Sequence, residues 1–329
     1  MKSSPQSSDD APWRSLYPYR GADLEIDGWR YHYVDSEQEN ASPVGPRGEN
    51  PALQTEDSWS RPVILCVHGN PTWSFYWRRV IERFGSEHRV IAVDHLGCGL
   101  SDKPSRRDAA YTLEAHRDRL LVLIDRLGLD RIVLLAHDWG GAIGLAAAVE
   151  RVDRMAGVVL LNTAAFPPPY VPWRIAACRL PVLGTAAMRG LNLFARAAIT
   201  MAMDKSDLSA EAAAGLLAPY ANWHDRVGID SFVRDIPMTR SHPTYEVLRQ
   251  LEADLPKLAG VRRCLIWGMK DWCFRPECLE RLLRHWPDAD AVRIADAGHY
   301  VMEDDPTQVL EVIAQFLTRL SDRGGDDGT

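Results

Sequence analysis

The chain has 329 residues, of which 46% are apolar and 25% are charged, and its net charge is -7. This composition is typical of a soluble globular protein, and the length suffices for one large core with an inserted lid or for two domains. The negative charge argues against general affinity for nucleic acid or anionic membranes. The first ten residues are polar, and no apolar run approaches the ~20 residues of a membrane span. The six cysteines lack the spacing of a metal site or a disulfide framework. We therefore expect a cytoplasmic protein.

Strand and helix signals alternate along most of the chain. The expected strands are 23–27, 30–34, 62–68, 89–94, 131–137, 155–162, 261–268 and 291–295. The expected helices are 77–84, 113–127, 141–151, 277–285 and 307–320. The alternation predicts an α/β fold with a mostly parallel eight-stranded sheet and helices on both faces. The first two strands, joined by Gly28, are expected to form an antiparallel hairpin at the edge.

The alternation stops after residue 162 and resumes near 261. The intervening segment contains prolines and two helical stretches, 191–203 and 210–217, without a convincing strand. It therefore predicts an inserted helical cap over the carboxyl edge of the sheet, where ligands bind in such folds. The predicted core consists of residues 21–165 and 246–320, and the predicted cap is 166–245. Residues 1–20 and 321–329 are expected to be disordered tails. A long surface loop is expected over 36–60.

A sharp turn is expected where the strand 131–137 ends. Residues 136–141 read AHDWGG and lead into a helix rich in small residues. Strand, tight turn and helix are the pattern of a nucleophile elbow, but Asp138 stands where many hydrolases carry serine. A carboxylate with a reference pKa of about 3.9 is already anionic at neutral pH. Asp138 is therefore predicted to attack directly and to form a covalent ester or anhydride.

Two more candidate catalytic residues follow later strands. Asp271 comes after the seventh strand and His299 after the eighth. Nucleophile, acid and histidine is the chain order of an α/β-hydrolase triad. We expect His299 to be the base that activates water, and Asp271 to accept the other ring N–H.

Asn70 and Trp139 are candidates for holding a leaving anion. Trp139 directly follows the nucleophile, and Asn70 lies on the loop after the third strand. A departing anion needs N–H donors in a site that excludes water. The histidines belong to separate loops, so neither a metal nor an organic cofactor is expected.

Three motifs resemble the haloalkane dehalogenase superfamily of α/β-hydrolases, and the resemblance extends over roughly residues 24–320. The motifs are 68–74 (HGNPTWS), 94–104 (DHLGCGLSDKP) and 137–141 (HDWGG). The resemblance implies an Asp–His–Asp triad and an Asn–Trp pair, which match the five residues above. No Glu follows the sixth strand, where another dehalogenase branch carries its acid, so Asp271 has no obvious rival.

Four other segments most closely resemble one branch of this superfamily. They are 97–100 (GCGL), 161–166 (LNTAAF), 218–220 (APY) and 232–237 (FVRDIP). That branch contains the β-lactone decarboxylases of bacterial long-chain olefin biosynthesis. The resemblance therefore implies a cis-dialkyl β-lactone (3-alkyl-4-alkyl-oxetan-2-one) as substrate, with an alkene and CO2 as products.

Other functions remain open at this point. A haloalkane dehalogenase would use the same nucleophile at a carbon–halogen bond. An epoxide hydrolase usually has an aromatic residue in place of Asn70 and needs cap tyrosines, for which Tyr170, Tyr220 and Tyr245 are available. A receptor without catalysis is the least favoured alternative because the triad is intact.

The cap contains an apolar stripe. It consists of Leu191, Phe194, Ala195, Ala198, Ile199 and Met201–Met203, and Arg174, Arg179, Arg189 and Arg196 are expected to face elsewhere. The stripe predicts the cap's own packing face, a tunnel for alkyl chains, or a face that docks another enzyme of the olefin pathway. Each buried CH2 contributes about 0.8 kcal/mol. A hydrophobic small molecule is therefore the expected ligand.

Overall fold

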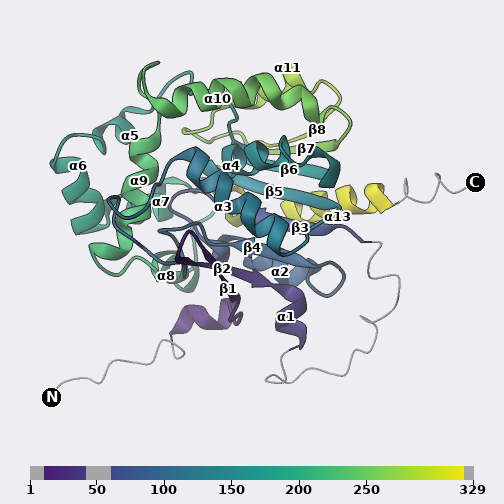
Figure 1. Ribbon diagram of the computed structural model, residues 1–329, viewed down its shortest axis with the longest axis horizontal. Coiled ribbons are helices and arrows are strands. Elements are labelled where there is room, and N and C mark those ends of the chain that lie inside the picture. The colour runs from purple at the N-terminus through teal and green to yellow at the C-terminus, as the bar shows by residue number, and fades with distance from the viewer. Residues whose placement is uncertain (1–10, 42–60, 322–329) are drawn as a thin grey trace, which may run out of the picture.

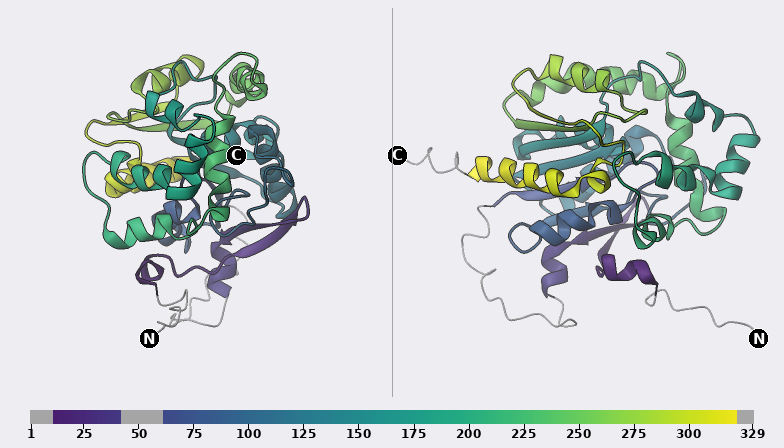
Figure 2. Two further views of the ribbon diagram at one scale, coloured as in Figure 1. Left: turned by 90° about the vertical axis from the view of Figure 1, so that its left-hand side faces the viewer. Right: turned by 180° about the vertical axis from the view of Figure 1, so that it is seen from behind.

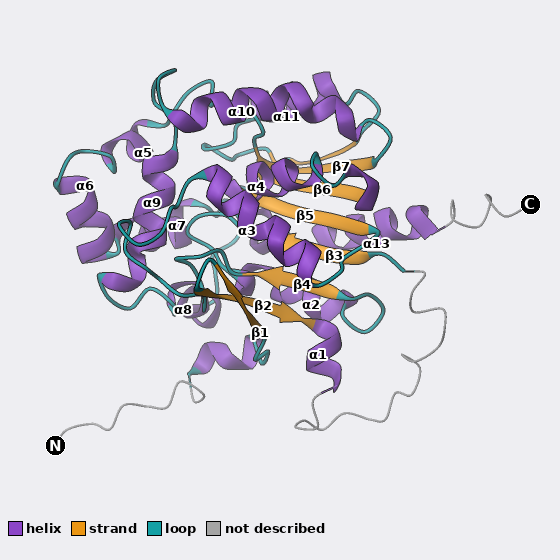
Figure 3. Ribbon diagram, in the orientation of Figure 1, coloured by secondary structure: helices purple, strands orange, loops and turns teal. Residues whose placement is uncertain are grey.

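Eight strands form one continuous sheet in the computed structural model, which describes residues 11–41 and 61–321 (Figures 1 and 3). The strands are β1 (Ala22–Ile26), β2 (Trp29–Asp35), β3 (Val63–Val67), β4 (Val90–Val93), β5 (Ile132–Asp138), β6 (Met155–Thr163), β7 (Arg262–Gly268) and β8 (Asp290–Ile294). Their order is β1-β2-β4-β3-β5-β6-β7-β8. The hairpin β1–β2 is antiparallel and β2 pairs antiparallel with β4, whereas β3 to β8 are parallel. The predicted fold class is confirmed.

The helices lie on both faces of the sheet and over its carboxyl edge. They are α1 (Ser36–Ala41), α2 (Arg78–Phe84), α3 (Leu113–Arg126), α4 (Trp139–Ala148), α5 (Trp173–Ala177), α6 (Leu183–Thr185), α7 (Leu193–Met201), α8 (Ala210–Leu217), α9 (Val227–Asp235), α10 (Pro243–Asp254), α11 (Pro276–His285), α12 (Val301–Asp304) and α13 (Pro306–Ser321). Between β6 and α10 every residue is described, and this stretch forms α5 to α9 without a strand. In Figure 2 (left) these cap helices face the viewer.

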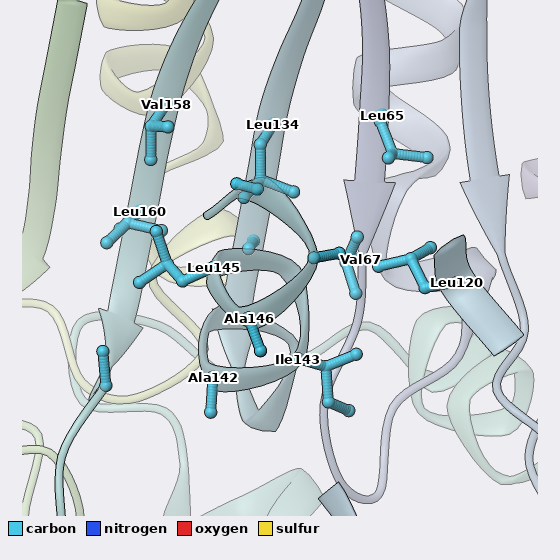
Figure 4. Packing of buried hydrophobic residues seen from close by; sticks show 14 of the residues in the cluster. Leu65, Val67, Leu120, Leu134, Ala142, Ile143, Leu145, Ala146, Val158 and Leu160 are labelled. Atoms are coloured by element: carbon cyan, nitrogen blue, oxygen red, sulfur yellow. The ribbon is translucent and has the colours of Figure 1, made fainter. Parts of the chain in front are cut away.

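Alternate residues of each central strand belong to two separate cores. In β5, Leu134 packs with α3, α4, α10 and α11, whereas Val133 and Leu135 pack with α2, α12 and α13 on the other face. Successive side chains of a strand point to opposite faces of the sheet. Because both sets of alternate residues are apolar here, both faces are buried. Figure 4 shows the first core, where Ile143 and Leu145 of α4 lie among strand side chains. A strand buried on both sides holds its carboxyl end in a fixed position.

Residues 11–20 correct the prediction of a disordered tail over 1–20. Residues Pro12–Leu16 form a 3-10 helix, and Trp13 and Tyr17 are buried. Both rings pack edge-on against Trp73, and the Tyr17 hydroxyl lies 2.6 Å from Ser74 Oγ. Two aromatic anchors within five residues tie this segment to the core. The remainder of the expected tail, residues 1–10, lies outside the described residues.

Three other boundaries differ from the prediction or lie beyond what the structure describes. The expected loop 36–60 begins with helix α1, and the rest of it, 42–60, is not among the described residues. Of the expected tail 321–329, only Ser321 is described, and it ends α13. Helix α10 begins inside the predicted cap range, yet its Leu248 and Leu251 are part of the core. None of the described helices is long and apolar enough to span a bilayer.

Candidate active site

Asp138 ends β5 on a strained turn. Its backbone has φ 54° and ψ -130°, a conformation that residues with a Cβ rarely adopt. The Thr163 hydroxyl donates to the Asp138 carbonyl at 2.5 Å. A Cβ at Gly140 would collide with the carbonyl oxygen of Val67, because α4 starts against β3. The small residue is therefore required for the helix to begin directly after the nucleophile, at Trp139 rather than at the predicted residue 141.

The three triad candidates meet at the carboxyl edge of the sheet. His299 Nδ1 lies 2.8 Å from Asp271 Oδ2, and His299 Nε2 lies 3.5 Å from Asp138 Oδ2. All three side chains are buried. The other Asp138 oxygen accepts the backbone N–H of Asn70 at 2.7 Å. Asp138 Oδ2, the oxygen facing His299, is thus the one without a backbone donor.

The protonation of this triad follows from its charges. Burial alone would lower the pKa of His299, but the Asp271 carboxylate, helped by Asp138, raises it to about 10. Burial alone would raise the pKa of Asp138, yet His299 and the Asn70 N–H outweigh burial and hold it below its usual value. The resting site at neutral pH therefore holds an anionic Asp138 beside a protonated His299. Once Asp138 is esterified, one of the two charges that protonate His299 is gone, and its pKa falls.

Asn70 and Trp139 line the same cavity as Asp138. The Asn70 amide is buried, and its Nδ2 makes a long contact of 3.4 Å to the Ile229 carbonyl. The half-buried Trp139 ring packs against Phe232 at 5.7 Å. The structure thus brings together all five residues that the sequence singled out.

Asn162 contacts the triad candidate Asp271, a role that the sequence analysis did not assign to it. It lies near the end of β6, and its side chain donates to Asp271 Oδ2 at 3.0 Å and to the Gly268 carbonyl at 3.0 Å. Its own oxygen accepts the Gly268 N–H at 2.8 Å. Asp271 Oδ1 accepts two further N–H groups, from Cys273 and Phe274. Asn162 therefore fixes Asp271 against β7, and its place in the segment 161–166 (LNTAAF) was the available sequence signal.

Asp304 is a second residue that supports the triad candidates and to which the sequence analysis assigned no role. Its carboxylate accepts the Gly298 N–H at 2.6 Å and the N–H groups of Asp204, Lys205 and Ser206 in the cap, at 3.0 to 3.2 Å. Gly298 directly precedes His299, so Asp304 ties the histidine loop to the cap. The acidic run at 303–305 was the only sequence signal.

A cavity of about 630 Å³ lies above Asp138 and is lined mainly by apolar side chains of the cap and core. The apolar stripe predicted in the cap, on and beside α7, separates into residues that line the cavity and residues that do not. Phe194, Ala198, Met201 and Ala202 line the cavity, whereas Ala195 and Met203 are buried elsewhere and Leu191 is 69% exposed. Arg174 also lines the cavity, contrary to its expected orientation, because its guanidinium lies over the Trp173 and Trp272 rings. Part of the stripe is therefore a ligand surface.

The three cap tyrosines do not present free hydroxyls to this cavity. The Tyr170 hydroxyl donates to the Cys273 carbonyl at 2.6 Å, and the Tyr220 hydroxyl to the Thr72 carbonyl at 3.2 Å. Tyr245 is not among the lining residues. These tyrosines therefore do not supply the acid that an epoxide hydrolase requires. Within the described residues, no group of three or more acidic, His or Cys side chains is placed to hold a metal.

Comparison with known proteins identifies the family. A family model described as the alpha/beta hydrolase fold matches residues 62–306. The chain belongs to the α/β-hydrolase family. It is 34% identical, over 92% of its length and 90% of the relative's, to a cis-3-alkyl-4-alkyloxetan-2-one decarboxylase of Shewanella oneidensis. It is 33% identical, over 94% and 99%, to haloalkane dehalogenase 2 of Mycobacterium tuberculosis.

Solved structures agree on the fold of this α/β-hydrolase. The crystal structure of haloalkane dehalogenase DatA from Agrobacterium tumefaciens matches with a TM-score of 0.74 at 22% identity, over 92% of this chain and 97% of that one. The family model and the relatives at 33–34% identity confirm the resemblance predicted from the sequence motifs, and the protein is an enzyme of the α/β-hydrolase family.

Proposed function

We propose that this α/β-hydrolase decarboxylates a cis-dialkyl β-lactone to an alkene and CO2. The observation that carries the proposal is a carboxylate nucleophile at the floor of a large apolar cavity. Relatives at 34% and 35% identity bear the name of this activity, in Shewanella oneidensis and Xanthomonas campestris. A cavity of about 630 Å³ falls in the usual range for ligands far larger than a short haloalkane.

The proposed reaction begins with displacement at a saturated carbon. Asp138 Oδ2 attacks the ring carbon that bears the ring oxygen, and that C–O bond breaks. The electron pair leaves with the oxygen, so the lactone becomes a substrate carboxylate joined to Asp138 through an ester. Asn70 and Trp139 hold the new anion with their N–H groups. No proton is transferred in this step.

The second step returns the enzyme to its resting state. The bond between the substrate's α-carbon and its carboxylate breaks, CO2 leaves, and the electron pair forms the C=C bond. The C–O bond to Asp138 breaks at the same time and restores the carboxylate. The protonated His299, 3.5 Å from Asp138 Oδ2, stabilises the returning charge. Water is not consumed, so His299 has no water to activate in this reaction.

Haloalkane dehalogenation is the second candidate, supported by the mycobacterial relative that aligns over 99% of its length. Displacement at a saturated carbon is common to both reactions, and halide would leave towards Asn70 and Trp139. Water must then cleave the ester, with His299 as base after its pKa has fallen.

Turnover of a cis-dialkyl β-lactone and of 1-bromobutane by the same preparation tests the proposal. We expect alkene from the lactone, lost in Asp138→Asn, and little bromide from the haloalkane. Bromide release without alkene would overturn the proposal in favour of dehalogenation. Binding without turnover of either would favour a receptor.

A further inference from the structure

Exposed apolar side chains are concentrated on the cap. Among residues 11–41 and 61–321, Leu16 is the only exposed large hydrophobic residue outside the cap. The others are Trp173, Leu180, Val182, Leu183, Leu191, Leu193, Trp223 and Met238. Val182 is 80% exposed and Trp173 is 74% exposed. Exposed apolar side chains that are concentrated on one part of a protein mark an interaction site.

Half of these exposed cap residues border the opening of the active-site cavity. Trp173, Leu180, Leu183 and Leu193 line the cavity and are also more than half exposed. The cavity therefore reaches the outside of the molecule at these four residues, which come from the α5–α6 region and the start of α7. In Figure 2 (left) these elements lie on the side turned to the viewer. A continuous apolar path leads from this surface to Asp138.

The charge of this segment is opposite to that of the whole chain. Residues 166–203 contain four arginines and neither Asp nor Glu, in a chain of net charge -7. Within the described residues, none of Arg174, Arg179, Arg189 and Arg196 forms a salt bridge, although Arg179 donates to three backbone carbonyls and Arg189 to one. Arg174 and Arg196 are exposed. Positive groups beside Trp and Leu are the composition that binds an anionic lipid surface.

We propose that the cap surface of residues 173–196 docks on an anionic lipid bilayer, so that the cavity opens into the lipid. A second copy of this chain fits less well, because a two-fold interface would place like charges against each other. A partner protein covering this surface would also close the cavity opening. The overall charge of -7 opposes docking in other orientations, which leaves the cap as the contact. Delivery of a dialkyl substrate from the lipid rests on the proposed function, whereas the docking itself does not.

Vesicle flotation with the full chain tests the docking. The probes are vesicles of phosphatidylcholine alone and of phosphatidylcholine mixed with phosphatidylglycerol. We expect binding to the mixed vesicles that weakens as salt is added. Val182→Asp combined with Leu191→Asp should weaken it by about tenfold or more, since two side chains lose their burial. Arg196→Gln should weaken it by about fivefold.

These variants and their control avoid the catalytic site. Val182, Leu191 and Arg196 do not line the cavity, and the φ of 61° at Val182 suits Asp better than Val. Leu16→Asp alters the exposed hydrophobic residue outside the cap and should leave vesicle binding unchanged. Turnover of a short-chain, water-soluble substrate should be unchanged in all of them, so failure of the reaction and failure of docking are measured separately.

Three results would overturn the proposal. The first is absence of binding to both kinds of vesicle. The second is equal loss of binding in Leu16→Asp and in the double variant. The third is a dimer, or a complex with another protein, that the double variant dissociates in ultracentrifugation while vesicle binding by the unmodified chain is absent.

Discussion

The floor and the rim of the cavity are built in opposite ways. At the floor, the single carboxylate of Asp271 accepts hydrogen bonds from four groups. The donors are Cys273, Phe274, Asn162 and His299. At the rim, Trp173 and Leu183 project from short helices and are 74% and 70% exposed. Fixed geometry is what a covalent reaction needs, because a displaced nucleophile loses its aligned attack. A rim without such fixation suits a ligand recognised by its apolar surface.

The largest expected effect is at the nucleophile. Asp138→Asn removes the charge that attacks, so turnover should fall by about 10⁴-fold or more while circular dichroism stays unchanged. Asp153→Asn, an exposed carboxylate after α4, is the matched control and should keep full activity. Substantial turnover by Asp138→Asn would mean that another group attacks.

The next effect tests how tightly the floor is packed. Gly140→Ala places a methyl group against the Val67 carbonyl, and backbone cannot move aside cheaply. We expect a loss of about 2–4 kcal/mol in the free energy of unfolding, measured with urea. Gly260→Ala is the control, because a Cβ there meets nothing within 4 Å. Equal effects of the two substitutions would contradict the close approach of α4 to β3.

The charge state of His299 gives a pH-dependent prediction. Its pKa of about 10 in the folded protein exceeds the value of about 6.5 in an unfolded chain, so folding favours the protonated form. This stabilisation is complete below pH 6.5 and is lost as the pH rises through 10. The free energy of unfolding should therefore fall over this range by a few kcal/mol more than in His299→Gln. Parallel profiles for the two proteins would show that His299 is neutral in the resting enzyme.

The smallest effect concerns the link between floor and cap. Asp304→Asn offers fewer acceptor sites for the N–H groups of Gly298 and of residues 204–206, so His299 is held less firmly. We expect kcat to fall by about tenfold, with a shifted pH profile, since one lost hydrogen bond to a charged group is worth about 1.5–3 kcal/mol. Asp305→Asn is the control. It loses an ion pair with Lys205 and should leave kcat and the pH profile unchanged. An unshifted pH profile would mean that Asp304 only stabilises the fold.

The sequence predicted all eight strands and the meeting of the five site residues. Strands buried on both faces carry long β-branched runs, and parallel strands bring their carboxyl ends to one edge. Asn162 escaped prediction because its partner Asp271 lies 109 positions away, and no local pattern reports such a contact. The bond from Gly298 to Asp304 is local, but the cap N–H groups that Asp304 also accepts lie 98 to 100 positions away. Trp13 and Tyr17 were assigned to a tail for the same reason, since their partners lie near residue 73.

The most direct test is whether Asp138 becomes covalently bound to the substrate. His299→Gln, mixed with a cis-dialkyl β-lactone or a 1-bromoalkane and quenched with acid within one turnover, is digested and analysed by mass spectrometry. We expect an added mass on the peptide that contains Asp138, absent when Asp138→Asn is combined with His299→Gln. An adduct on another residue, or none with either compound, would contradict this expectation.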